Sequence, residues 1–214
     1  MKENRINKAP ESRMVGKVLS MIDHLYPTIE NEARRIFIDE NKEAMKIIKR
    51  KFDFRLAFHA WFILKFEFPS GATGMEMADS FPMDFFNKDE KIMIKNFLNY
   101  KESLFKILKI SRNKRDYKIK DLIDKRIYLI KTLDFPAEFL ERQLIKSAII
   151  KNIEGDYFFY GSVQLFNIKD RSNFIREMIS VLNIEKIIRE KRKEGIIEWE
   201  FDKENKHKKD ASQP

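Results

Sequence analysis

The hydrophobic period of this chain changes near residue 101, and that change narrows the folds it can adopt. Before this point, apolar residues recur at spacings of three and four, as on one face of a helix. After it come short segments rich in Ile, Tyr, Phe and Val, separated by stretches with Asp, Asn and Gly, as in strands joined by turns. We therefore predict an α+β protein in which a helical N-terminal bundle precedes a small sheet.

The helical half has recognisable starts and stops. An apolar stripe covers 14–25, and Pro27 ends that helix. Thr28 is expected to cap the next helix, whose apolar face reaches Phe37. The stretch 56–68 is so apolar that we expect a central helix buried on all sides. A further helix is expected over about 89–100, with four residues turned inward: Ile92, Ile94, Phe97 and Leu98.

Two of the six glycines stand in the stretch 66–81, directly before a predicted helix. Thr73 and Glu76 have the spacing of a capping box, in which each side chain accepts a hydrogen bond from the other residue's backbone N–H. Gly71 and Gly74 would then give the loop its backbone freedom. A phosphate site is the alternative, but the Lys and Ser/Thr of a Walker loop are absent, and GATG lacks basic residues in its middle. We expect a structural turn.

Five short strands are expected between about 103 and 166, which predicts a small antiparallel β-barrel or curled sheet. The segment 132–143 is interpreted as a short helical or bent connection between two strands. After Asn167 the helical period returns, and Gly195 is expected to end a C-terminal helix. The residues of this helix expected on its apolar side are Phe174, Ile175, Met178, Ile179, Leu182 and Ile187.

These patterns divide the chain into four parts. We expect a helical domain over 1–101 and a small basic β-barrel-like domain over 102–168. A C-terminal helix and short strand over 169–201 should pack back on them, and 202–214 should be a disordered tail. No internal repeat is visible, so none of these parts is predicted to be a copy of another.

The residue types present exclude or disfavour several chemistries. The chain has no cysteine, which excludes disulfides, thiolate metal sites and cysteine nucleophiles. The histidines, His24, His59 and His207, have no metal-binding spacing, and His59 is expected to be a core residue. Glu76 and Asp79 stand three apart, but capping and surface roles explain them better than an acid pair. We therefore expect no catalytic residues, no metal site and no cofactor, and an enzyme is the less favoured class.

The sequence also predicts where the protein resides. The N-terminal residues lack the apolar core of a signal peptide. No apolar run approaches the roughly 20 residues of a membrane span. We expect a cytoplasmic protein that does not enter a membrane.

Most of the net charge lies in one short segment. The chain carries 43 basic and 34 acidic residues, a formal net charge of +9. The segment 106–131 holds ten basic and three acidic residues, an excess of seven. A basic hairpin can neutralise phosphates, and Tyr117 or Tyr128 could stack on bases if exposed. The alternative is a solvated strand face on which lysine prevents edge-to-edge aggregation.

Lys118 and Lys120 alternate with Tyr117 and Ile119, which places the two cations on the outer face of a strand. The residues predicted to bind nucleic acid are Arg112, Lys114, Arg115, Lys118, Lys120 and Arg126. The leading hypothesis is thus a non-enzymatic binding or adaptor protein whose ligand is RNA or DNA. The alternative is a protein-interaction or assembly module that uses an aromatic helical surface (Phe58, Trp61 and Phe62) or the helix 174–193.

Three sequence stretches, WFILKFEFPSGATGMEMA, SLFKILKI with YKIKDLIDKRIYLI, and GDYFFYGSVQLF, resemble a pattern found in a group of prokaryotic proteins. In that group a helical region with a tryptophan-containing end precedes a small β-module, and many members carry a C-terminal SEC-C zinc motif. The resemblance covers roughly 60–166. The SEC-C motif itself is absent, because the chain has no cysteine. The resemblance implies a helical part plus a small barrel, and it implies no catalytic residue.

Overall fold

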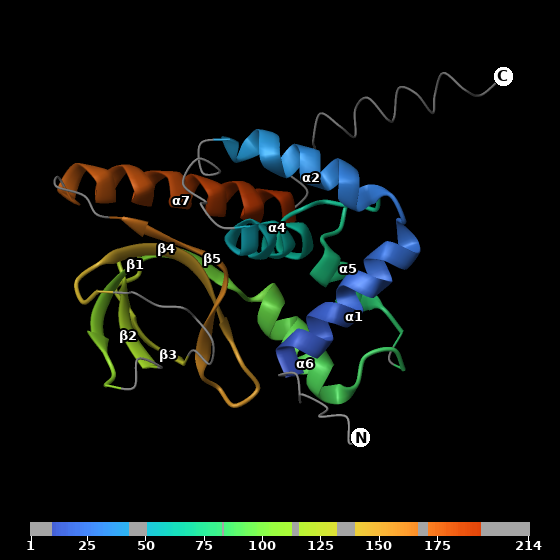
Figure 1. Cartoon of the computed structure of the whole chain (residues 1–214), viewed down its shortest axis with the longest axis horizontal. Helices are drawn as coiled ribbons and strands as arrows, with labels where there is room; N and C mark the ends of the chain where they lie inside the picture. The colour runs from blue at the N-terminus through green and yellow to red at the C-terminus, as the bar shows by residue number, and fades with distance from the viewer. Residues whose placement is uncertain are drawn as a thin grey trace. The chain divides into compact units, whose positions relative to one another are not determined.

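The computed structural model of the chain describes residues 10–42, 51–82, 84–112, 116–131, 140–166 and 171–193. The chain divides into two compact units, 1–167 and 168–214. Among the described residues, the first unit holds five helices and a five-stranded sheet, and the second holds one helix (Figure 1). The predicted α+β class is therefore confirmed.

Most helices of the first unit begin and end close to where the sequence predicts, but the helix predicted over 56–68 spans Lys51–Leu64 and is not buried on all sides, since Arg55 is exposed. They are α1 (Pro10–Leu25), α2 (Ile29–Glu40), α4 (Lys51–Leu64), α5 (Gly74–Ser80) and α6 (Lys88–Leu98). The apolar stripe of α1 is buried as predicted, with Met14, Val18 and Ile22 at 1% exposure or less. Thr28 differs from the prediction, because it stands at the N-cap position of α2 but its side chain makes no capping hydrogen bond.

The glycine stretch before α5 forms the predicted capping box. The Thr73 N–H donates to Glu76 Oε2 at 2.8 Å, and the Glu76 N–H donates to Thr73 Oγ1 at 3.4 Å. Gly71 has a φ of +77°, a left-handed conformation that glycine adopts without strain. Gly74 is required for a different reason than predicted, since a Cβ there would lie 2.9 Å from Ile22 Cδ1. The carboxylate of Glu76 takes the place that an anion would occupy, so the stretch is a structural turn.

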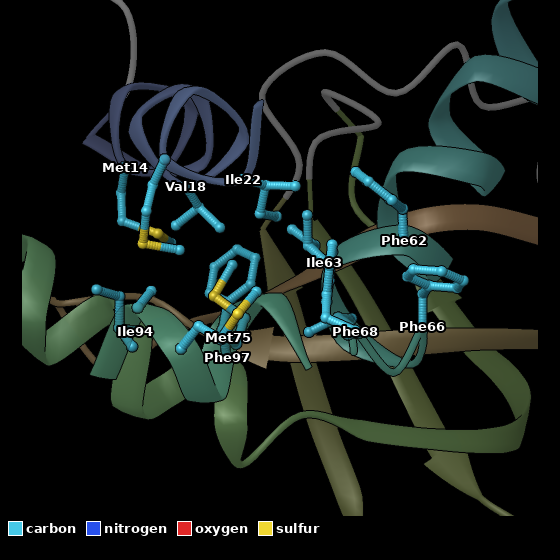
Figure 2. Close-up of a cluster of buried hydrophobic side chains, with 14 of the residues drawn as sticks. Met14, Val18, Ile22, Phe62, Ile63, Phe66, Phe68, Met75, Ile94 and Phe97 are labelled. Carbon is cyan, nitrogen blue, oxygen red and sulfur yellow. The ribbon is translucent and has the colours of Figure 1, made fainter. Parts of the chain in front are cut away.

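One apolar core joins the five helices (Figure 2). Side chains from α1, among them Met14 and Val18, point towards Met75 of α5 and Phe97 of α6 in Figure 2. Phe58 of α4 is fully buried in the same core. Burying a side chain of this size contributes roughly 1.5–3 kcal/mol, which is why the amphipathic stripes in the sequence locate this core well.

Helix α6 departs from the sequence prediction at two points. It begins with an unforeseen capping box, in which the Glu90 N–H donates to Asn87 Oδ1 and the Asn87 N–H donates to Glu90 Oε2, both at 2.9 Å. Lys17 of α1 lies 2.7 Å from the same carboxylate oxygen. Burial alone would raise the pKa of Glu90, but the hydrogen bonds from Lys17 and Asn87 outweigh it and lower the pKa. Ile92 is 39% exposed, so the prediction that it faces the core is wrong.

The sheet curls so far that the first and last strands in its order pair with each other. Its strands are β1 (Lys101–Ile110), β2 (Asp116–Asp121), β3 (Ile127–Lys131), β4 (Leu144–Lys151) and β5 (Tyr157–Phe166). They follow the order β1-β2-β3-β5-β4, and β4 pairs again with β1. The predicted curled sheet of about five strands is confirmed. Four of the pairings are antiparallel, and β3 pairs with β5 in parallel, so the sheet is mixed.

Strand β1 pairs with two neighbouring strands. Its residues 101–106 pair with β4, and 105–110 pair with β2. The register with β2 shifts between Ile107 and Lys109, where a bulge bends the strand. Apolar side chains fill the interior of the curl, and the buried ones are Phe105, Ile107, Tyr117, Ile119, Ile130, Ile145, Ile149 and Phe159.

Helices cover the outer side of β4 and β5. Helix α4 contacts β5, and α6 contacts β4. Tyr160 of β5 lies with its ring 4.8 Å from the ring of Phe97, and burial raises its pKa. Gly161 allows the closest approach, because a Cβ at this position would lie 2.7 Å from Ala60 Cβ. The helices and the sheet therefore form one unit. Whether 1–101 and 102–168 also fold as separate domains stays a prediction.

The second unit is described by its helix, α7 (Arg171–Lys193). Leu182 is buried, as predicted, whereas Ile187 is 50% exposed and does not lie on a buried side. The predicted connection 132–143 lies outside the described residues except for its last four positions. The predicted helix end at Gly195, the strand at 196–201 and the tail at 202–214 also lie outside the described residues.

Candidate nucleic-acid interface

The outer side of β1, β2 and β3 carries four lysines and two aliphatic residues, which we call the lysine face. Its members are Lys106, Lys109, Lys118, Lys120, Ile127 and Leu129. Residues next to them in the strands, such as Ile119 and Ile130, are buried inside the curl. Because side chains alternate along a strand, these six point away from that interior.

The strand register places the lysines opposite each other. Lys106 of β1 faces Lys120 of β2, and Lys120 in turn faces Ile127 of β3. In the next row, Lys109 faces Lys118, and Lys118 faces Leu129. Each row therefore reads lysine, lysine, aliphatic across three strands. Neighbouring strands lie about 4.8 Å apart and alternate residues of a strand about 6.8 Å apart, so the four charges share one small patch.

None of the four lysines is neutralised within the part of the chain that the structure describes. Each is at least partly exposed, and none forms an ion pair with a described residue. Lys131 shows the contrast, because its ammonium lies 2.6 Å from Asp156 and the hydrogen bond raises its pKa. The potentials of the face lysines therefore add.

The six residues predicted to bind nucleic acid have different outcomes. Lys118 and Lys120 lie on the lysine face, as their alternation with apolar residues suggests. Arg112 and Arg126 are exposed next to the ends of β1 and β3. Lys114 and Arg115 lie outside the described residues.

Sequence reasoning missed two lysines of the face, Lys106 and Lys109, as well as its aliphatic residues. Both lysines were counted in the basic segment, but their strand alone does not show which residues lie opposite them. The pairing of Lys109 with Lys118 depends on the bulge between Ile107 and Lys109, which shifts the register. No signal in the sequence marks that bulge.

The tyrosines considered for base stacking are not available for it. Tyr117 is 1% exposed and belongs to the interior of the curl. The ring of Tyr128 is half-buried and packs against the rings of Phe105 and Tyr157, at centroid distances of 6.2 and 5.1 Å. The exposure that base stacking would require is therefore not met, because alternation turns both tyrosines inward.

Two of the three acidic residues of the hairpin, Asp121 and Asp124, are engaged at one of its ends, whereas Asp116 lies two residues from Lys118 on the same side of β2 and pairs in register with Lys131. Asp121 is fully buried, and its Oδ1 accepts hydrogen bonds from the Ser103 hydroxyl at 2.8 Å and the Ile123 N–H at 2.7 Å. Lys101 Nζ lies 2.9 Å from Asp121 Oδ2 and 2.6 Å from Asp124 Oδ2. Both carboxylates are thus engaged by Lys101 rather than by a lysine of the face.

Ionisation in this cluster follows from the same contacts. Burial alone would lower the pKa of Lys101, but the hydrogen bonds to Asp124 and Asp121 outweigh it and raise the pKa above its usual range. Burial likewise works against the charge of Asp124, yet the bond from Lys101 lowers its pKa. Burial and the neighbouring carboxylates raise the pKa of Tyr128, whose hydroxyl donates to Asp124 at 3.2 Å. These pKa shifts favour the charged forms of Lys101 and Asp124, and the cluster closes the β2–β3 turn.

A second candidate is a hollow of about 410 Å³ between α2 and α4, lined by Glu30, Arg34, Phe54, Arg55 and His59. His59 is half-buried here rather than a core residue, and its pKa is lowered by burial and by Arg55. Arg34 is already engaged, because it lies 2.6 Å from Glu30 and 4.6 Å from the centre of the Phe58 ring. The carboxylate of Glu30 opposes an anionic ligand, so this hollow is the weaker candidate.

The remaining sequence candidates have structural roles. Glu76 belongs to its capping box, and the backbone carbonyl of Asp79 accepts a hydrogen bond from Lys91 at 3.1 Å. Phe58 and Phe62 are at most 2% exposed, so they cannot form the suggested aromatic docking surface. Among the described residues, no three His, Asp or Glu side chains converge as a metal site would require.

The described helices also include none with the length and apolar character to span a bilayer. Comparisons of the chain with protein-family models, curated proteins and solved structures give no match. The resemblance to the proteins that carry SEC-C motifs therefore stays a prediction.

Proposed function

We propose that this protein is a cytoplasmic, non-enzymatic binding or adaptor protein that holds the phosphates of RNA or DNA on its lysine face. Lysine binds phosphate as a compact point charge, and clustered lysines gain affinity by displacing the counterions of a nucleic acid. Four such charges lie on one exposed patch, without an ion pair among the described residues.

The observation that carries this proposal is the repeated opposition of like charges. Lys106 faces Lys120 and Lys109 faces Lys118, both on neighbouring strands. Like charges directly opposite each other destabilise a sheet, by roughly 0.2–1 kcal/mol per pair. A protective role against edge pairing does not explain them, since β1 and β2 each have a partner strand on both sides. A polyanionic ligand would remove the repulsion.

Further cations extend the proposed interface. Arg112 and Arg126 are exposed and stand next to strand ends of the same hairpins. We also include Lys114 and Arg115 in the proposed interface. They are basic and occur in the sequence between β1 and β2. Each arginine adds a planar donor group that suits phosphate oxygens.

The proposal is tested by gel shift with mixed RNA and DNA at 50 and 200 mM salt. If four phosphates are engaged, affinity for a single strand should fall about 50-fold over that range. The variant Lys118→Gln/Lys120→Gln should bind at least about tenfold more weakly at the lower salt. The matched control is Lys88→Gln/Lys95→Gln, which removes the same charge from exposed positions of α6. Equal binding by both variants would overturn the proposal.

A second candidate function is a protein-interaction or assembly module that uses α7. Val181, Ile184 and Ile187 are 46–53% exposed and recur every three residues on this helix. Recurrence at this spacing places apolar residues on neighbouring parts of a helix surface. Apolar docking would change little with salt, so the gel-shift series separates this candidate from phosphate binding. Size-exclusion chromatography of wild type and Ile184→Lys tests it directly, and identical elution profiles would exclude self-assembly through α7.

A further inference from the structure

The lysine face is not uniformly charged, and its third strand carries aliphatic residues at the positions where the rows continue. Ile127 is 53% exposed and lies opposite Lys120. Leu129 is 51% exposed and lies opposite Lys118. A ligand that covers both rows must therefore place anionic groups over β1 and β2 and an apolar surface over β3.

We infer that the ligand of the lysine face is single-stranded nucleic acid, with phosphates over the lysines of β1 and β2 and base faces against Ile127 and Leu129. This inference rests on the proposed function. A duplex presents its sugar–phosphate backbones and the edges of its bases, while the apolar base faces are stacked inside. An unpaired strand exposes those faces, so it matches a patch that is cationic on one side and apolar on the other.

The dimensions of the patch agree with this arrangement. The aliphatic row lies one strand, about 4.8 Å, from the lysines of β2 and two strands from those of β1. A nucleotide separates its phosphate from its base by one sugar ring, so both can be contacted on neighbouring strands. Lys118 and Lys120 stand about 6.8 Å apart along β2, which lets successive nucleotides use successive rows.

The residues of the face also predict how the strand is read. The six side chains of the lysine face include no aromatic ring and no amide. The amide hydrogen bonds that read adenine edges are thus absent from the face, its lysines are placed over phosphates, and aliphatic contact replaces aromatic stacking. Binding should therefore be independent of base sequence and depend mainly on phosphate charge.

The test is fluorescence anisotropy with a labelled oligothymidine of about 20 nucleotides and a blunt duplex of the same length, at constant salt. The single strand should bind the wild type at least about tenfold more tightly than the duplex. The variant Ile127→Thr/Leu129→Thr places a β-branched residue, which favours a strand, at both positions. It should lose about fivefold or more on the single strand and change little on the duplex. The control Ile38→Thr/Ile92→Thr removes two exposed aliphatic residues from helices and should bind like wild type.

A variant designed to bind more tightly controls for misfolding, because a misfolded protein would lose affinity rather than gain it. Leu129→Tyr supplies the missing aromatic ring and should tighten single-strand binding about fivefold or more. The inference is overturned if the duplex binds as tightly as the single strand and both changes to the aliphatic row leave the single strand unaffected. If the proposed phosphate binding is correct, the variant Lys118→Gln/Lys120→Gln still lowers the affinity for both the single strand and the duplex in that case. If the lysine variant binds both ligands as tightly as wild type, the proposed function is overturned as well.

Discussion

The two outer sides of the curled sheet are built from similar strands but meet different surroundings. The side formed by β4 and β5 lies against α4 and α6 and joins its aromatic residues to the helical core. The side formed by β1, β2 and β3 exposes four lysines, Ile127 and Leu129. Packing constraints explain the residues of the covered side. The open side contains like charges that packing does not require, and for this reason we propose it as the functional surface.

The comparison predicts that substitutions on the covered side of the sheet lower the free energy of unfolding most. Gly161→Ala adds a methyl group 2.7 Å from Ala60 Cβ at a φ of +79°. Strain and overpacking together should lower the free energy of unfolding by about 3 kcal/mol. Urea denaturation followed by circular dichroism measures this. Gly16→Ala is the control, because no atom lies within 4 Å of its added methyl group and a helical position gains from alanine. If both variants are equally stable, the close contact between α4 and β5 is incorrect.

The second prediction concerns the buried charge at the edge of the open side. Lys101→Met leaves Asp121 fully buried without its cation. Loss of one partner from a buried pair is costly, and with Lys101 partly exposed we expect a decrease of about 2 kcal/mol in unfolding free energy. Lys101→Arg should retain most of the stability. A loss below about 0.5 kcal/mol for the methionine variant would show that the cluster contributes little.

A substitution on the lysine face should raise the free energy of unfolding, whereas the two changes above lower it. Lys120→Glu places a carboxylate opposite Lys106 and turns a repulsive pair into an attractive one. We expect unfolding free energy to rise by about 0.5–1 kcal/mol, with a smaller gain at high salt, while nucleic-acid affinity falls. Denaturation and anisotropy on the same preparation test both signs. A variant that is less stable than wild type would contradict the inference that the opposed lysines cost stability.

The smallest expected effect is a dependence on pH. The pKa of Asp124 is lowered in the folded state, so its ionisation adds stability above the ordinary aspartate pKa, near 3.9. That contribution is lost as the pH falls through the folded-state pKa. Asp124→Asn should thus be less stable than wild type at pH 7, and the difference should vanish in acid. Urea midpoints between pH 7 and pH 2 measure it, and a gap that persists at the lowest pH would contradict it.

Local patterns predicted much of the fold. The stripe of α1, the capping box of Thr73 and Glu76, and the five strands depend on residues close together in sequence, and the structure confirms them. Long-range features were not predictable in this way. The parallel pairing of β3 with β5 and the shift between Ile107 and Lys109 arise from how distant strands meet.

The candidate site shows the same limit. Alternation alone placed Lys118 and Lys120 on an outer face, but the same alternation turns Tyr117 and Tyr128 inward. Which lysines of β1 lie opposite depends on register, and no local pattern states it. Charge counting also cannot show that Lys101, which lies outside the basic segment 106–131, forms ion pairs with two carboxylates of that segment, Asp121 and Asp124.

The most direct test of the account replaces the four face lysines, Lys106, Lys109, Lys118 and Lys120, by glutamine in one variant. We predict that its unfolding midpoint is equal to or above that of wild type, because the opposed charges are gone. The slope of log K against log salt for a single strand should become shallower by about 2.8, the value for four lost phosphate contacts. An unchanged slope would contradict the claim that this open side binds phosphate.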